Sequence, residues 1–221
     1  MGDILGEYDV LAAFWLTIQL AFFSAIGSLL IGTVVAIMRV SPVRILQLLG
    51  TWYVNIFRNT PLTLLMVFSI LGATFILGIN LAPDSITDNA KRWAIVMLSI
   101  YHAAFVCEAL RSGVNTVPAG QAEAARSVGM TFGQSMRHVI LPQAFRGSIA
   151  PLGSTLIALI KNTTVAAVIG VAEAAGLMSE IVENKGSSIG IFLIFALGFV
   201  ILTLPLGVLF TSMSRRLAVK R

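Results

Sequence analysis

Four consecutive polar residues, Lys161, Asn162, Thr163 and Thr164, stand inside a long apolar stretch of this chain. Lys161 lies about 14 residues into a predicted helix, roughly 20 Å from its nearer loop at 1.5 Å per residue. A charge at such a depth in an apolar helix usually faces a cavity or a partner. The run therefore predicts the wall of a polar pathway, with Lys161 suited to attract a carboxylate. Alternatively, Lys161 caps carbonyls, pairs with an acid or extends to the membrane surface.

A second polar group precedes another apolar stretch. Thr60 suits the N-cap of a helix and Pro61 its first position, so Arg58, Asn59 and Thr60 are expected at a helix start. Arg58 suits either a pathway or lipid phosphates. Glu108 is expected to form an ion pair with Arg111 or Arg58, and a gating role is the alternative.

No constellation predicts catalysis or metal binding. The chain has one cysteine and two histidines, too few for a metal centre built from either. Residues 186–190 match the nucleophile pattern Gly-x-Ser-x-Gly, but no strand, turn and helix surround them. The chain also lacks the glycine-rich phosphate loop of ATPases. We therefore expect no enzyme activity, and a membrane-embedded enzyme is a rejected alternative.

The composition predicts an integral membrane protein. Of 221 residues, 57% are hydrophobic and 11% are charged, against about 25% charged in soluble domains. Apolar runs long enough to cross a bilayer recur, and no cleaved signal peptide is expected. We predict one all-α domain, residues 1–221, with five transmembrane helices. Their expected ranges are 10–38, 58–79, 92–112, 147–169 and 188–212.

The basic residues predict an orientation. With the N-terminus outside, the loops 39–58 and 111–146 and the C-terminal tail lie inside and hold most of the arginines. The outer side then holds only Lys91, Arg92 and Lys185, as the positive-inside rule requires. The net charge of +5 therefore reflects topology and predicts no nucleic-acid partner. An outer helix is expected over 171–184, whose Glu173, Glu180 and Glu183 are expected to be solvated, with contact to a protein as the alternative.

The insert at about 113–146 has its own helical pattern. Pro118 can open a helix, Gly129 can end it, and Thr131 with Gln134 has the spacing of a capping box. A second short helix is expected to stop near Pro142. Two short helices joined at a glycine form a knob that either docks on a partner or packs on the bundle and binds nothing.

This insert resembles the EAA loop of permease subunits of bacterial ABC importers. The family spacing is present in Glu123-Ala124-Ala125, Gly129 and Leu141-Pro142, with Val139 where isoleucine is usual. The resemblance implies the type I ABC importer permease fold and a loop that docks on a separate ATPase. The residues implied in coupling are Gln121, Glu123, Ala124, Ala125, Gly129, Val139, Leu141 and Pro142.

More of the chain resembles permeases of polar amino-acid importers, the branch with histidine and glutamine permeases. The segments 58–64, 120–127, 161–164 and 216–220 look most like a glutamate permease. The resemblance implies a multi-pass protein of the bacterial cell membrane. It also implies partners: an ATPase dimer carrying ATP and Mg, a second related permease, an extracellular binding protein and membrane lipid.

Glutamate is the expected substrate, with glutamine, aspartate or a basic amino acid as alternatives. The residues expected along the pathway are Arg58, Asn59, Thr60, Glu108, Lys161, Asn162, Thr163 and Thr164. A remote alternative is an ion-coupled secondary transporter, although no inverted repeat is evident.

Overall fold

The computed structural model describes residues 6–217, and within that range every regular element is a helix. The long elements are α2 (Val10–Val40), α3 (Arg44–Asn59), α5 (Ile86–Asn115), α8 (Leu141–Asn162) and α10 (Ile189–Leu217). The short ones are α4 (Leu62–Val67), η1 (Phe68–Ile76), α6 (Ala119–Ser127), α7 (Phe132–Ser135), η2 (Met136–Ile140), η3 (Thr163–Ile169) and α9 (Ala174–Lys185). The prediction of an all-helical chain is confirmed.

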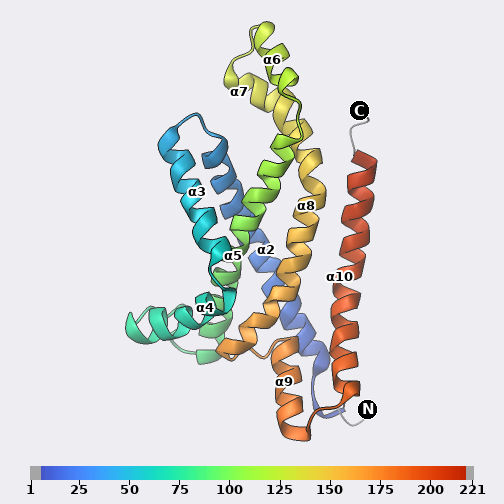
Figure 1. The fold of residues 1–221 in the computed structure, drawn as a ribbon. Coiled ribbons are helices and arrows are strands. Elements are labelled where there is room, and N and C mark those ends of the chain that lie inside the picture. The colour runs from blue at the N-terminus through green and yellow to red at the C-terminus, as the bar shows by residue number, and fades with distance from the viewer. Residues whose placement is uncertain (1–5, 218–221) are drawn as a thin grey trace.

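Residues 6–217 contain five apolar passes if one bent pair counts as a single pass. Four helices in this range are long and apolar enough to cross a membrane alone: 10–40, 86–115, 132–169 and 189–217. The fifth pass is α3 followed by α4 and η1, which meet at an angle of 97°. In Figure 1, α4 and η1 leave the bundle sideways, while α3 runs alongside α2.

The expected helix over 58–79 is present over residues 62–76 as α4 and η1, but the chain breaks at Thr60–Pro61 and residues 58 and 59 belong to α3. A proline disfavours helical backbone in the residue before it, and Thr60 is extended, with φ −96° and ψ 130°. The Thr60 hydroxyl donates to the Ile56 carbonyl, so Thr60 closes α3 and does not cap the next helix. The expected loop over 39–58 is wrong for residues 44–58, which are helical as part of α3. Arg44 and Arg58 lower the mean hydropathy of this segment, which is why the sequence did not reveal the helix.

Small residues bring α2 and α5 into close contact. A Cβ on Gly32 would lie 2.7 Å from the Ala103 carbonyl oxygen, and one on Gly27 would lie 2.4 Å from Ser99 Oγ. Ser24 and Ser28 on the same side of α2 are fully buried. Such stripes of small residues let helices pack closely in a membrane, where the hydrophobic effect does not drive one helix against another.

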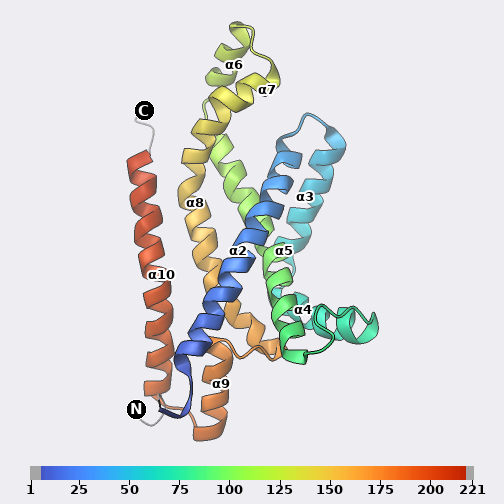
Figure 2. The same ribbon diagram turned by 180° about the vertical axis from the view of Figure 1, so that it is seen from behind.

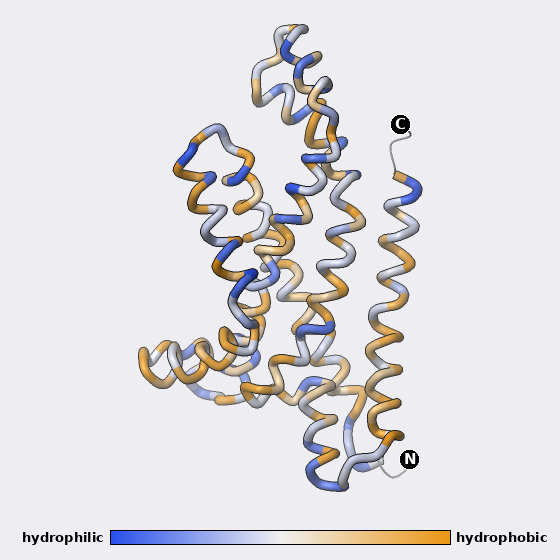
Figure 3. Tube along the Cα trace, in the orientation of Figure 1, coloured by the Kyte–Doolittle hydropathy of each residue, from blue (hydrophilic) through white to orange (hydrophobic). Residues whose placement is uncertain are grey.

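Polar residues gather at both ends of the molecule. Figure 3 shows hydrophilic residues on α6 and α9, with apolar helices between them. The described part of the C-terminus, the α2–α3 turn and α6 lie toward one end, and α9 lies at the other (Figures 1 and 2). The orientation prediction also counted Asp3 on the outer side and Lys220 and Arg221 in the inner tail, and these three residues lie outside the described ones. The orientation itself stays a prediction.

Candidate functional site: a coupling knob and a polar pocket

The knob at 119–135 is built as its sequence predicts. Gly129 has φ +82°, where glycine carries no Cβ penalty. Its N–H donates to the Arg126 carbonyl at 2.9 Å, and the Met130 N–H donates to the Ala125 carbonyl at 3.1 Å. These two bonds form a Schellman motif that ends α6.

A complete capping box then starts the next helix. The Gln134 N–H donates to Thr131 Oγ1 at 3.3 Å, and the Thr131 N–H donates to Gln134 Oε1 at 2.9 Å. This prediction is confirmed.

The expected stop near Pro142 is wrong. A π-helical turn, η2, joins α7 directly to α8, so residues 132–169 form one apolar helix. Pro142 lies in the first turn of α8. The wider turn before it accommodates a residue that has no N–H to donate. The knob is therefore continuous with a membrane helix.

The knob leaves most of its motif residues accessible. Within α6, Gln121, Glu123 and Ala124 are exposed, whereas Ala125 is buried. Gly129 is exposed and Val139 is half-buried. Leu141 and Pro142 are exposed at the start of α8. The exposed members occupy the protruding end of the molecule, which Figure 2 shows from behind.

A hollow of about 230 Å³ lies between α5 and α8; it is called the polar hollow below because four of its six lining residues are polar, while most of its exposed lining surface is apolar. It is lined by His102, Phe105, Ser154, Thr155, Ala158 and Asn162. Asn162 Nδ2 lies 3.1 Å from His102 Nε2. His102 is buried, and its Nδ1 has no hydrogen-bond partner within residues 6–217. The residues around the hollow thus include an amide, two hydroxyls and an imidazole, and the Thr155 hydroxyl donates to the Pro151 carbonyl at 2.9 Å.

Of the expected pathway run, only Asn162 lines this hollow. Lys161 is exposed and is not part of the lining. Thr163 is fully buried, and its hydroxyl donates to the Ile160 carbonyl at 2.7 Å. The Thr164 hydroxyl donates to the Lys161 carbonyl at 2.8 Å.

Glu108 is shared by three arginines. It pairs with Arg39, lies 3.2 Å from Arg111 Nη2 and lies 3.9 Å from Arg58 Nη1. The structure therefore brings together the two partners expected for Glu108 and adds Arg39. Three cations around one carboxylate leave an excess of positive charge.

The cluster of Glu108 and its three arginines is connected to the hollow by the Phe105 ring. The Arg58 guanidinium lies 5.6 Å from the centre of the Phe105 ring, a cation–π distance. Asn59 and Thr60, the neighbours of Arg58, instead bond to the carbonyls of their own helix.

Two functional candidates escaped sequence reasoning, His102 and Arg39. A histidine inside an apolar pass is itself a signal, since ionisable groups there are costly and usually serve a purpose. Arg39 ends a long helix, and no spacing rule pairs it with Glu108, 69 residues away along the chain.

Glu173 is buried, which contradicts the expectation of a solvated side chain. Its carboxylate accepts from the N–H groups of Ala175 and Gly176, both at 3.0 Å, and from the Thr17 hydroxyl at 3.3 Å. It caps α9 and ties it to α2. Burial raises the pKa of Glu173 above its ordinary value, while these three donors oppose the rise. Glu180 and Glu183 are exposed, as expected.

These features together define a class of protein. Five apolar passes, a polar hollow within them and a protruding helical knob at one end describe the membrane subunit of a transport system.

Comparison with known proteins gives the family. Residues 28–219 match the model of the binding-protein-dependent transport system inner membrane component, and the chain belongs to this family. It is therefore a multi-pass membrane component rather than an enzyme.

Relatives and solved structures agree with this assignment. The chain is 52% identical over 218 residues to the glutamate transport system permease protein GluC of Corynebacterium glutamicum, covering 96% of both chains. It is 35% identical to the probable glutamine ABC transporter permease protein GlnM of Bacillus subtilis, covering 92% of this chain and 91% of the relative. A solved amino acid ABC transporter with histidines matches with a TM-score of 0.83 at 28% identity, over 94% of this chain and 93% of the other.

Proposed function

We propose that this chain is one permease of an ATP-driven importer for L-glutamate, forming half of an alternating-access pathway. The observation that carries the proposal is the polar hollow between α5 and α8, whose lining includes Asn162 and His102. The chain's similarity to GluC supports glutamate as the substrate.

The charges around the hollow suit an anionic substrate. No carboxylate lines it, and the nearby Glu108 is neutralised by Arg39 and Arg111. Arg58 reaches the hollow through the Phe105 ring. A positive potential of this kind raises the local concentration of an anion. Two of the remaining pathway candidates, Lys161 and Thr164, lie within two residues of Asn162 in the sequence. The other two, Asn59 and Thr60, directly follow Arg58.

The second permease completes the hollow from the other side. Ala150, Ser154, Ala158 and Asn162 recur every four residues along α8, and the first three are exposed. By contrast, the small stripe of α2 is buried against α5 within this chain. An exposed stripe of small residues allows the close approach of another helix.

The knob docks on the ATPase, which binds ATP and Mg, while this chain binds neither. The N-terminus and α9 lie outside, where a binding protein delivers the substrate, and the knob and C-terminus lie inside. All 221 residues serve as one permease domain, with the loop at about 113–146 as its coupling element. Because the knob is continuous with α8, movement of the ATPase is transmitted along α8 to Asn162.

Uptake of labelled glutamate tests this function. Cells that lack this gene are complemented with the wild-type chain or with Gly129→Asp, and aspartate, glutamine, arginine and histidine serve as competitors. We expect the wild-type chain to restore uptake that depends on ATP. Gly129→Asp is expected to insert in the membrane but not to transport.

Three results would contradict parts of the proposal. Restoration of another amino acid's uptake would refute glutamate and leave the importer intact. Uptake driven by an ion gradient would indicate a secondary transporter. Full activity of Gly129→Asp would refute coupling through the knob.

A further inference from the structure

Helix α3 has three distinct sides. One side packs on α2 and α5: Val54 is fully buried, and the Tyr53 hydroxyl donates to the Ile100 carbonyl at 2.6 Å. A second side is exposed and apolar, and it carries Ile45, Leu48, Leu49, Trp52 and Ile56. A third side, called the polar stripe of α3 below, carries Arg44, Gln47, Thr51, Asn55 and Arg58. The members of this stripe recur every three or four residues and fall within an arc of about 80° at 100° per residue.

The polar stripe is open in this chain. Thr51 is half-buried, and the other four members are exposed. The stripe follows about 21 Å of α3 at 1.5 Å per residue, and α3 is the first part of the bent apolar pass. Polar residues within a membrane pass face protein or water rather than lipid, whereas the apolar side of α3 suits lipid. The polar stripe therefore faces either another protein or water.

Water is the better partner for this stripe. The Gln47 amide already donates to the Ser41 carbonyl at 2.8 Å, and the Thr51 hydroxyl donates to the Gln47 carbonyl at 2.7 Å. Neither side chain therefore depends on a second subunit for a hydrogen bond. The long side chains of Arg44, Gln47 and Arg58 also prevent the close helix approach that the small residues of α8 allow.

The polar stripe connects the polar hollow with the end of the molecule that carries the knob. At one end of the stripe, the Arg58 guanidinium lies 5.6 Å from the centre of the Phe105 ring, which lines the hollow. At the other end, Arg44 begins α3 after the α2–α3 turn, and this turn lies toward the same end of the molecule as α6 (Figure 1). That end is expected to face the cytoplasm. The stripe thus leads from the hollow toward the cell interior.

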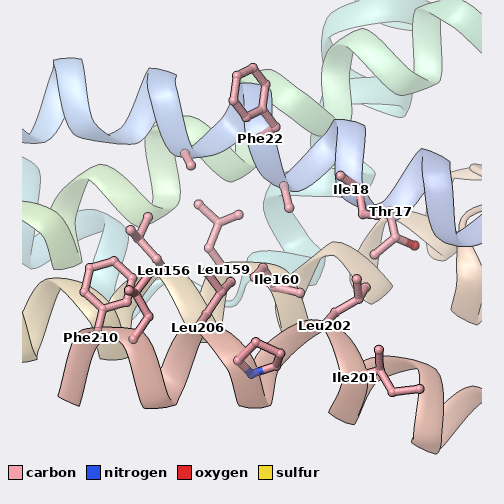
Figure 4. Close-up of a pocket in the computed structure, with 14 residues that line it drawn as sticks. Thr17, Ile18, Phe22, Leu156, Leu159, Ile160, Ile201, Leu202, Leu206 and Phe210 are labelled. Carbon is pink, nitrogen blue, oxygen red and sulfur yellow. The ribbon is translucent and has the colours of Figure 1, made fainter. Parts of the chain in front are cut away.

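The opposite side of α8 offers no comparable route. A hollow of about 600 Å³ lies there between α2, α8 and α10, and Thr17 is the one polar residue among the described residues of its lining (Figure 4). Thr17 is fully buried, and its hydroxyl donates to the Ala13 carbonyl at 3.1 Å. A charged solute that entered this hollow would lose its hydration without gaining hydrogen bonds.

We propose that the polar stripe of α3 lines the route by which the substrate leaves the polar hollow for the cytoplasm. Arg58 meets the carboxylates of the substrate at the hollow, and Arg44 stands at the exit. No member of the stripe is acidic, so the two arginines give the route a positive potential that favours an anion. This inference deepens the proposed function, on which its substrate and direction rest. The access of water to the stripe depends on neither.

Labelling of single cysteines tests whether the stripe faces water. The assembled importer is held in nanodiscs without nucleotide, and the native Cys107, which is buried, is replaced by alanine in every variant. Thr51→Cys and Asn55→Cys place the thiol on the stripe, while Trp52→Cys and Ile56→Cys place it one residue further along, on the apolar side. Trp52 is 64% exposed and Ile56 is 57% exposed, so the control positions are not buried within this chain. We expect a charged methanethiosulfonate reagent to label the stripe at least tenfold faster than the controls.

Uptake of glutamate after labelling tests whether the substrate uses this route. The importer is placed in proteoliposomes with its binding protein and ATP, and a sulfonate adduct on Thr51→Cys narrows the route and repels an anion. We expect uptake at least fivefold below that of the same variant before labelling, whereas treated Trp52→Cys should keep its uptake. Complete labelling of Thr51→Cys with unchanged uptake would overturn the route while leaving the glutamate importer intact.

The charge of the route is tested with two reagents at Asn55→Cys. The rates of a negative sulfonate reagent and a positive ammonium reagent are each divided by their rates with a free thiol at low salt. Arg58→Gln should lower the ratio of the negative to the positive rate about sevenfold, because a unit charge roughly 7 Å away in water changes each rate about threefold in opposite directions. Arg58→Lys should preserve the ratio, and an unchanged ratio in Arg58→Gln would refute the role of Arg58.

Other results would overturn the water-filled route itself. Equal labelling of the stripe and the apolar side, or slow labelling of both, would show that the stripe does not border water. Crosslinks from unlabelled stripe cysteines to the companion permease would identify a subunit interface instead. If Thr51→Cys does not assemble or transport, Gln47→Cys and Asn55→Cys repeat both measurements on the neighbouring turns of α3.

Discussion

Replacing Asn162 with aspartate changes the charge of the polar hollow while nearly preserving its shape. The new carboxylate would stand where Asn162 Nδ2 now lies 3.1 Å from His102 Nε2. A glutamate bound in the hollow would place its own carboxylate within roughly 6 Å. At an effective dielectric constant of about 20, two like charges at that distance repel by about 3 kcal/mol. This corresponds to an increase of about a hundredfold in KM for glutamate if the full repulsion is felt.

The assay is uptake into proteoliposomes that contain the assembled importer, with glutamate and glutamine compared. Glutamine has nearly the shape of glutamate but an uncharged side chain, so its KM should change only a few-fold. Asn80→Asp is the matched control, because it makes the same change at an exposed residue outside the lining of the hollow. A KM for glutamate within threefold of the wild type, at normal expression, would refute the assignment of this hollow to the substrate.

Substitutions at three further positions test the remaining geometry. Gly113→Ala should destabilise the chain by about 1–3 kcal/mol through overpacking, because its Cβ would lie 2.0 Å from Ser148 Oγ; thermal unfolding in detergent measures this, and an unchanged midpoint would contradict the close approach of α5 and α8. Gly129→Ala should cost only about 1–2 kcal/mol, from its positive φ, because its Cβ meets no atom within 4 Å; normal assembly with reduced ATPase stimulation is expected, and loss of the folded chain would argue against a purely local effect. Glu173→Ala should destabilise by about 1–3 kcal/mol by leaving buried donors unsatisfied. Glu173→Gln should cost less, because its one oxygen can still accept from Ala175 and Thr17 while its NH2 faces the Gly176 N–H. Because the pKa of Glu173 is raised in the folded state, wild-type stability should increase as pH falls through that raised value toward 4.5, and persistence of this gain in Glu173→Gln would assign it to another group.

Local rules predicted the knob because its structure depends on neighbours in sequence. The positive φ of Gly129 and the bonds between Thr131 and Gln134 each involve residues within three positions. The stop at Pro142 failed because a π turn accommodates the proline. That turn forms where the short helix continues into a membrane helix, and rules based on neighbouring residues do not take this continuity into account.

Contacts between distant segments were less predictable. Hydropathy located the four long passes and residues 62–76 of the bent one, but it missed α3, whose arginines and glutamine dilute its apolar residues. The pairing of Glu108 with Arg111 followed from helical spacing, whereas that with Arg39 required α2 to cross α5. Likewise, Glu173 resembled a solvated acid because only the fold brings Thr17 to it.

The unbroken helix from Phe132 to Ile169 also limits how the gene can vary in length. Each inserted or deleted residue between Pro142 and Asn162 would turn Asn162 by about 100° relative to the knob. A single-codon insertion there would direct the amide toward lipid while leaving every other side chain of the hollow chemically unchanged. Functional homologues should therefore tolerate substitutions across this segment but keep its residue count fixed, and length variation should be confined to the loops at the outer end.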